Sequence, residues 1–177
     1  MFVWLASALT VLGIASLIVI APLTAESSPH LAKSIYRAFA ALCHQLPERS
    51  YFIDGHKLAV CARCTGLYAG FALTTLLYPL IRPLKTIDWP ARSWLILAAI
   101  PMAIDFSLTF FGLWENTHTS RLLTGLLLGG ASVFYVMPGL AELSTRKTRT
   151  SRSVVVLTSP HPMPSGPSDY SAPERRI

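Results

Sequence analysis

Charge is scarce in this chain: 14% of its 177 residues are Asp, Glu, Lys or Arg, whereas 52% are hydrophobic. A soluble domain carries about 25% charged residues, so the composition argues against an ordinary soluble protein and is typical of a membrane protein. Fifteen basic residues face nine acidic ones. The basic residues flank apolar segments and do not form a patch interleaved with aromatics, which argues against a nucleic-acid partner and favours contact with the lipid bilayer.

Cysteine is also scarce. The chain has three cysteines, and all of them lie between Leu42 and Gly70. Three cysteines cannot all pair with one another, so one of them would stay free, bind a metal or pair between chains.

Four apolar runs are each long enough to cross ~30 Å of hydrocarbon. They predict transmembrane helices over about residues 2–23, 59–81, 93–112 and 122–140. The first run has no Lys or Arg before it and is long for a signal peptide, so we expect it to remain; cleavage is the alternative. The sequence therefore predicts a membrane domain over residues 1–143. A basic tail rich in Pro and Ser, of the composition of disordered segments, would follow over residues 144–177.

A shorter amphipathic segment stands between the first two apolar runs. Ser28 followed by Pro29 is a plausible helix start. Apolar residues then recur at helical spacing, at Leu31, Ile35, Ala38, Phe39 and Leu42. Such a helix would lie on the bilayer or pack on the bundle. The fold class predicted is all-α: a four-helix integral membrane bundle with a short amphipathic helix and a cysteine-rich loop before the second span.

The cysteine segment has the donor atoms of a zinc site. Cys61 and Cys64 form a Cys-x-x-Cys pair, whose sulfurs can occupy two corners of a zinc tetrahedron. Cys43 and His44 could supply the other two corners if the backbone turns sharply between them, and His56 is the substitute ligand. The predicted metal ligands are therefore Cys43, His44, Cys61 and Cys64.

Two other interpretations of these cysteines remain open. The Cys61/Cys64 pair could cycle between dithiol and disulfide, because a helix N-terminus and the neighbouring Arg63 would both favour a thiolate. The protein would then be a membrane thiol-disulfide oxidoreductase. Alternatively, the cysteines could be a structural staple or small core residues.

The segment Cys43-His44-Gln-Leu-Pro-Glu-Arg-Ser50, followed by Cys61-Ala-Arg-Cys64-Thr-Gly66, resembles the signature of a family of small predicted membrane proteins of unknown function from bacteria and archaea. The resemblance covers about residues 38–130, including Pro101-Met-Ala-Ile-Asp105 and Asn116-x-x-x-x-Arg121. The resemblance implies a membrane architecture, a location in a bacterial or archaeal cell membrane and a set of candidate site residues. It implies no activity.

Polar residues converge on one side of the predicted bundle. With four spans, the loop after the first helix and the loop after the third lie on the same side. That side holds the cysteine segment together with Glu115, Asn116, His118 and Arg121. Asp105 would lie ~10 Å below this surface. A carboxylate inside a span is costly and indicates function, so Asp105 and Arg121, as an ion pair, join Cys61 and Cys64 as catalytic candidates. Glu115 or Asn116 could cap the fourth helix.

Orientation and partners follow from charge and glycine spacing. Cytoplasmic termini place nine basic residues inside and six outside, so the cysteine loop would be extracytoplasmic. The pairs Gly66/Gly70 and Gly125/Gly129 form small-x-x-x-small faces that would join the second and fourth helices or bind a partner or second copy. Assembly factor or transporter subunit is thus a third hypothesis, and whether the protein is an enzyme stays open.

Overall fold

The computed structural model of the protein describes residues 2–84 and 88–158. The chain divides into two units, Met1–Ser144 and Thr145–Ile177. The first unit contains the helices described below. Residues 159–177 of the predicted tail lie outside the described residues, whereas 145–158 continue the last helix.

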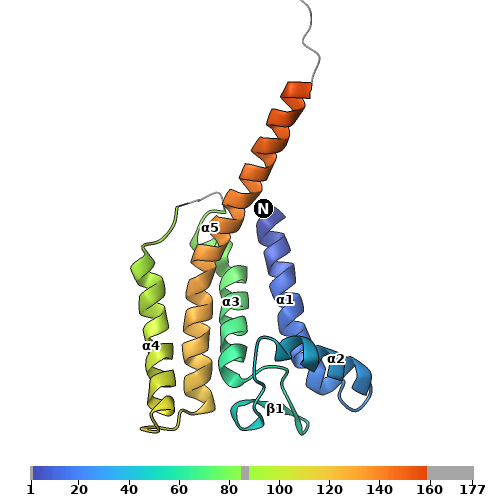
Figure 1. Cartoon of the computed structure of the whole chain (residues 1–177), viewed down its shortest axis with the longest axis vertical. Helices are drawn as coiled ribbons and strands as arrows, with labels where there is room; N and C mark the ends of the chain where they lie inside the picture. Colours follow the sequence, from blue (N-terminus) through green and yellow to red (C-terminus); the bar gives the residue numbers. More distant parts are fainter. Residues whose placement is uncertain (1, 85–87, 159–177) are drawn as a thin grey trace, which may run out of the picture. The chain divides into compact units, whose positions relative to one another are not determined.

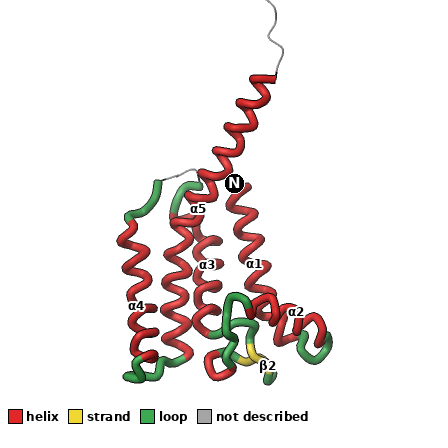
Figure 2. The backbone as a smooth tube through the Cα atoms, in the orientation of Figure 1, coloured by secondary structure: helices red, strands yellow, loops and turns green. Residues whose placement is uncertain are grey.

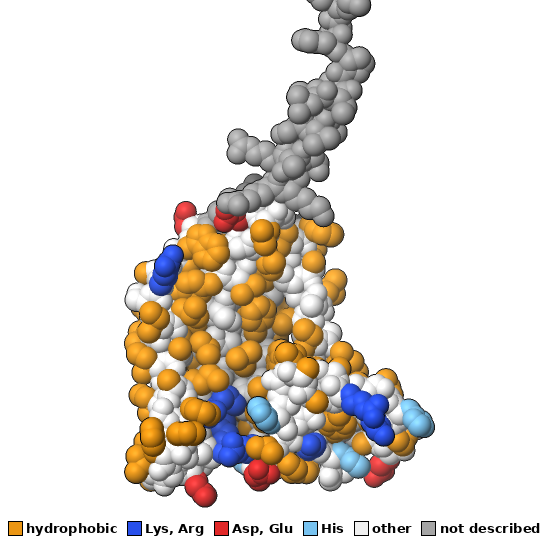
Figure 3. All heavy atoms as spheres, in the orientation of Figure 1, with side chains coloured by type: hydrophobic (Ala, Val, Ile, Leu, Met, Phe, Trp, Pro, Cys, Tyr) orange, Lys and Arg blue, Asp and Glu red, His pale blue; other side chains and the backbone are white. Residues whose placement is uncertain are grey.

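Four helices in the described part of the chain are long and apolar enough to cross a membrane. They are α1 (Phe2–Leu23), α3 (Ala62–Ile81), α4 (Arg92–Phe110) and the stretch His118–Ser144 of α5 (His118–Thr158). Within the first unit these helices stand side by side in the order α4, α5, α3, α1 (Figure 1). Apolar side chains cover their flanks, and charged side chains gather toward the ends (Figure 3). The predicted four-helix membrane bundle is confirmed.

The start of α3 differs from the prediction. Ala59 and Val60 belong to the preceding loop and are completely buried against α1, where the Ala59 N–H lies 3.5 Å from the Ile18 carbonyl oxygen. Cys61 is the extended N-cap residue of α3. Packing against α1 thus keeps these apolar residues out of the helix that their composition favours.

The hairpin between α4 and α5 is shorter than predicted and shifted toward the N-terminus. It covers residues 111–117, whereas the predicted spans leave residues 113–121 between them. Gly112 follows α4 with φ of +67°, a left-handed conformation that glycine adopts without steric cost and that ends helices. Before α5, the Ser120 N–H donates to the Thr117 hydroxyl at 3.1 Å, so Thr117 is the capping residue. Glu115 and Asn116 therefore do not cap α5 as the sequence suggested.

The amphipathic segment forms α2 (Pro29–Ala40), with Ser28 as N-cap residue and Pro29 at the first position. Its buried side chains are Ala32, Ile35 and Phe39, which lie against α1 and the loop. Leu31, Ala38 and Leu42 of the predicted stripe are exposed, so the face that α2 buries is rotated from the one that the spacing suggested.

The loop from α2 to α3 folds back on itself. It contains a single 3₁₀ turn, η1 (Pro47–Arg49), and a two-stranded antiparallel hairpin of β1 (Phe52–Ile53) and β2 (His56–Lys57). Asp54 and Gly55 at the tip both have positive φ, +50° and +79°, as a tight hairpin turn requires. Figure 2 shows the hairpin at the same end of the bundle as α2.

The two glycine pairs meet inside the chain. A Cβ atom on Gly66 would lie 2.9 Å from the carbonyl carbon of Leu122, and one on Gly129 would lie 2.9 Å from that of Leu67. Gly70 and Gly125 show the same close approach. The parallel helices α3 and α5 therefore pack backbone to backbone, which is the first of the two predicted alternatives. A partner or second copy could not use these faces without displacing a helix of the same chain.

Candidate metal centre and its pocket

Three sulfur atoms meet at the N-terminus of α3. The Sγ atoms of Cys43, Cys61 and Cys64 all lie within 4.8 Å of one another. Around one Zn²⁺ with Zn–S bonds of ~2.3 Å the sulfurs would be about 3.8 Å apart, so small side-chain rotations suffice to bind one ion. All three cysteines are free thiols.

A sharp turn after His44 holds Cys43 in place. Gln45 is buried and has φ of +51°, an unfavourable conformation for a residue with a side chain. Two hydrogen bonds stabilise it: Gln45 Nε2 donates to the Tyr36 carbonyl oxygen at 2.7 Å, and Lys57 Nζ donates to the Gln45 carbonyl oxygen at 2.6 Å. The turn thus lies at Gln45, one residue after His44, and not between Cys43 and His44 as the zinc hypothesis required.

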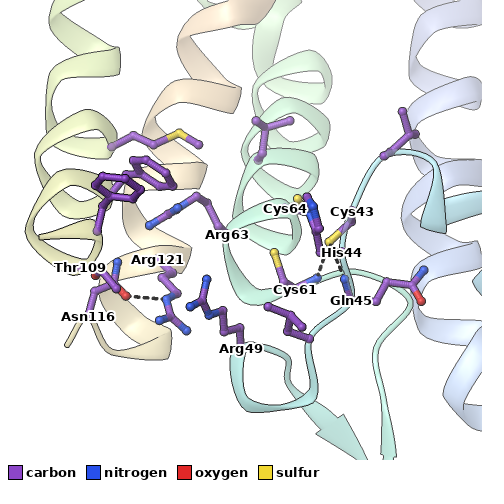
Figure 4. Close-up of a pocket in the computed structure, with 16 residues that line it drawn as sticks. Cys43, His44, Gln45, Arg49, Cys61, Arg63, Cys64, Thr109, Asn116 and Arg121 are labelled. Carbon is purple, nitrogen blue, oxygen red and sulfur yellow. Dashed lines mark hydrogen bonds between the residues drawn. The ribbon is translucent and has the colours of Figure 1, made fainter. Parts of the chain in front are cut away.

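Backbone donors point at the buried sulfur of Cys43. The Cys61 N–H lies 3.2 Å and the Gln45 N–H 3.5 Å from this Sγ (Figure 4). The side chain is held by the core of α1, α2 and the loop and is 6% exposed. The two N–H groups and the surrounding core therefore fix the position of this sulfur beside Cys61.

Cys61 has the most strongly perturbed thiol outside the spans. The hydrogen bond from the Cys64 side chain, more than any other interaction, lowers the pKa of Cys61 to about 5, while burial opposes the shift. Weaker hydrogen bonds from the Cys64 backbone and the Cys43 side chain add to the effect. The lowered pKa favours the thiolate form of Cys61, which is the form that binds metals and attacks disulfides.

The histidines lie differently with respect to the sulfurs. His44 lines the same cavity as the three cysteines, although its ring nitrogens are not part of the compact three-sulfur group. His56 lies in the hairpin, with Nε2 3.6 Å from a carboxylate oxygen of Glu26. The His118 ring lies tilted by 47° against the Tyr51 ring, with 5.5 Å between the ring centroids. Of the two predicted histidine ligands, only His44 borders the cavity.

The cysteines open into a cavity of about 590 Å³. Its walls come from the cysteine loop, the first turns of α3, the lower half of α4 and the start of α5 (Figure 4). The polar lining residues other than the cysteines are His44, Gln45, Arg49, Arg63, Thr109, Asn116 and Arg121. The predicted convergence of both loops on one polar site is therefore observed.

The predicted ion pair of Asp105 with Arg121 is wrong in its partner. Asp105 Oδ2 accepts from Arg63 Nη2 at 2.5 Å and from Asn116 Nδ2 at 2.6 Å. Arg121 reaches the pair only through Asn116, whose Oδ1 accepts from Arg121 Nε at 2.7 Å. Asp105 points toward α3 and not toward the start of α5, because the rotation of α4 about its axis directs it there.

The sequence did not predict the contacts of two residues that line the cavity. Asn116 is buried and hydrogen-bonds with both Asp105 and Arg121. The sequence had placed it on the cysteine side of the bundle and as a possible cap, without these partners. Arg49 belongs to the segment that carries the family resemblance, and the structure adds that it lines the cavity. Spacing within the chain carries no signal for either contact, since both depend on how separate helices and loops meet.

The chain is similar to two uncharacterized archaeal proteins. No solved structure matches the chain. An uncharacterized protein of Methanocaldococcus jannaschii is 42% identical over 113 residues, which cover 64% of this chain and 72% of the relative. An uncharacterized protein of Methanothermobacter thermautotrophicus is 39% identical over 93 residues, 51% of this chain and 80% of the relative.

The family model for predicted membrane proteins of the type DUF2085 matches residues 43–135. The match begins at the first cysteine and ends within α5, so it contains all the cysteines, Asp105 and Arg121. Since the matched segment is more than half of the sequence and carries the whole site, the chain belongs to the DUF2085 family of predicted membrane proteins.

Proposed function

We propose that this protein is an integral membrane metalloprotein that holds a zinc ion through Cys43, Cys61 and Cys64. The observation that carries the proposal is the convergence of three sulfurs within 4.8 Å of one another at the rim of a cavity. Two backbone N–H groups directed at Cys43 Sγ support it, because they stabilise a ligand that must be deprotonated.

Three sulfur ligands leave one position of a zinc tetrahedron open. His44, which borders the same cavity, is the proposed fourth ligand. With His44 bound the site would be closed and structural. If a water or substrate took that position instead, the ion could act as a Lewis acid. Of the catalytic candidates, Arg121 lines the same cavity, and Asp105 pairs with Arg63, which also lines it.

Metal analysis of the purified full chain tests the proposal. We expect close to one zinc per chain in the wild type and loss of the metal in Cys43→Ser, Cys61→Ser and Cys64→Ser. His56→Ala is the matched control and should keep the metal, because His56 lies outside the sulfur group. Wild-type protein that takes up no zinc under reducing conditions would reject the proposal.

A thiol-disulfide oxidoreductase is the second candidate, and the lowered pKa of Cys61 favours it. Oxidation of Cys61 and Cys64 to a disulfide would release two protons and two electrons to an acceptor of the quinone class. Trapping with an alkylating reagent in intact cells should then find part of the protein with this disulfide. Full reduction under oxidising conditions would count against this function.

We infer that the termini are cytoplasmic and the cysteine site extracytoplasmic. The excess of basic residues on the side of the termini, nine against six, supports this orientation. The orientation is measured by labelling intact cells with a membrane-impermeant thiol reagent. The variant Glu48→Cys places a new cysteine at an exposed position of the cysteine loop. We expect labelling there and none at Asp88, in the loop between α3 and α4; the reverse pattern would invert the orientation.

A further inference from the structure

Three guanidinium groups converge on the cavity beside the cysteines. Arg49 comes from η1, Arg63 from the first turn of α3 and Arg121 from the first turn of α5. Figure 4 shows these side chains directed into the space between the loop, α3 and the α4–α5 hairpin. Residues far apart in the sequence thus bring three positive charges to one pocket.

One carboxylate compensates one of these charges. Asp105 pairs with Arg63, whose guanidinium also lies 5.7 Å from the ring centroid of Phe106. Within the described residues, no carboxylate lies within 4 Å of Arg49 or Arg121. Arg121 uses its Nε to bind Asn116, which fixes the plane of the guanidinium and leaves its two terminal nitrogens for another acceptor.

Guanidinium groups that line one cavity repel one another. The apolar side chains of the same cavity strengthen such repulsion by lowering the local dielectric. An anion between the guanidinium groups would remove the repulsion. Phosphate fits this arrangement, because two arginine forks can each donate paired N–H groups to its oxygens.

We propose that the cavity binds a phosphate group at Arg49 and Arg121, carried either by a membrane lipid or by a free phosphate. The cavity is also lined by the apolar side chains of Leu67, Met102 and Phe106 of α3 and α4. Two arginines and apolar side chains in one cavity match an amphiphile with a phosphate headgroup. The site needs no metal ion, so it stands apart from the zinc proposal.

Calorimetric titration of the purified full chain in neutral detergent tests the site with two probes, dioctanoyl phosphatidic acid and inorganic phosphate. We expect Arg49→Gln and Arg121→Gln each to weaken binding by about tenfold, as loss of a charge-assisted contact does. Arg37→Gln, an exposed basic residue of α2 that does not line this cavity, is the matched control and should change binding less than about twofold. Arg121→Lys, which keeps the charge, should recover part of the loss and shows that the fold is intact.

The two probes separate the sources of the phosphate. Arginine-dependent binding of phosphatidic acid alone assigns the pocket to a lipid headgroup, and equal binding of inorganic phosphate assigns it to a free phosphate. Both measurements are repeated after zinc is removed by a chelator, and the arginine dependence should remain. Absence of binding by both probes, or binding that the Arg49 and Arg121 variants leave unchanged, overturns the proposal.

Discussion

Helix α3 has two regions built by opposite physical means. Along its length, Gly66 and Gly70 let α5 approach to backbone contact. This contact between α3 and α5, called the seam below, has no room for a side chain and contains no charged group. At its N-terminus, Cys61, Arg63 and Cys64 line an open cavity of about 590 Å³. The seam gains stability from close packing of small residues. The cavity leaves the cysteine sulfurs and the Arg63 guanidinium open to a ligand. The same helix therefore combines a closely packed face with an open cavity.

The largest expected effect breaks the seam. Gly70→Leu would force the α3 and α5 backbones apart, because even a Cβ atom at this position meets the Leu126 carbonyl carbon at 2.8 Å. We expect a loss of roughly 4 kcal/mol or more of folding free energy, beyond the usual cost of overpacking. Thermal unfolding in detergent measures it. Gly13→Leu in α1 is the control, since a Cβ there meets no atom within 4 Å; equal losses in both variants would contradict the seam.

The next largest effect concerns the ion pair between Asp105 and Arg63 beside the cavity. Asp105→Ala leaves Arg63 largely buried without its carboxylate, and we expect a loss of about 3 kcal/mol, the lower range for a broken buried pair. Adding Arg63→Leu should recover part of the loss, whereas adding Arg121→Leu should recover less. Thermal unfolding of the two double variants decides between the partners. Equal recovery would mean that Arg121 is coupled to Asp105 as strongly as Arg63 is.

The smallest expected effect concerns the pH dependence of alkylation at Cys61, at the N-terminus of α3. With the pKa of Cys61 lowered to about 5, its thiolate is fully formed above that pH and is lost as pH falls through about 5. In the metal-free protein, alkylation of Cys61 should therefore change less than about twofold between about pH 6.5 and 7.5. An ordinary thiol gains about tenfold over this interval.

Mass spectrometry of the alkylated peptide gives the rate at Cys61. Cys64→Ala removes the side chain that lowers this pKa most and should restore a steep pH dependence. A steep dependence already present in the wild-type protein would show that Cys61 is an ordinary thiol.

The helices could be predicted because lipid leaves little choice. An isolated apolar segment of about 20 residues must satisfy its backbone hydrogen bonds within itself, and a helix does so. All four spans were therefore recognisable from apolar runs alone. The end of α4 at Phe110 and the start of α5 at His118 shifted, because Gly112 and Thr117 act through local turn and capping geometry.

The sequence also predicted the cysteine cluster, because all three cysteines lie in one short segment that leads into the second span, and this segment limits how far apart they can be. The number of spans determines that the loop after the first helix and the loop after the third lie on the same side of the membrane. The sequence by itself thus determined which residues share the polar end of the bundle. It also determined that the glycine pairs of α3 and α5 are suited to close contact.

Only the tertiary structure decided which of these residues touch. The position of Asp105 along α4 sets its depth, but the rotation of α4 about its axis decides that it meets Arg63 and Asn116 and not Arg121. Packing of Ala59 and Val60 against α1 likewise delays the start of α3 and makes Cys61 its N-cap residue. Helical periodicity describes each helix separately, whereas the rotation and register between helices depend on contacts among all of them.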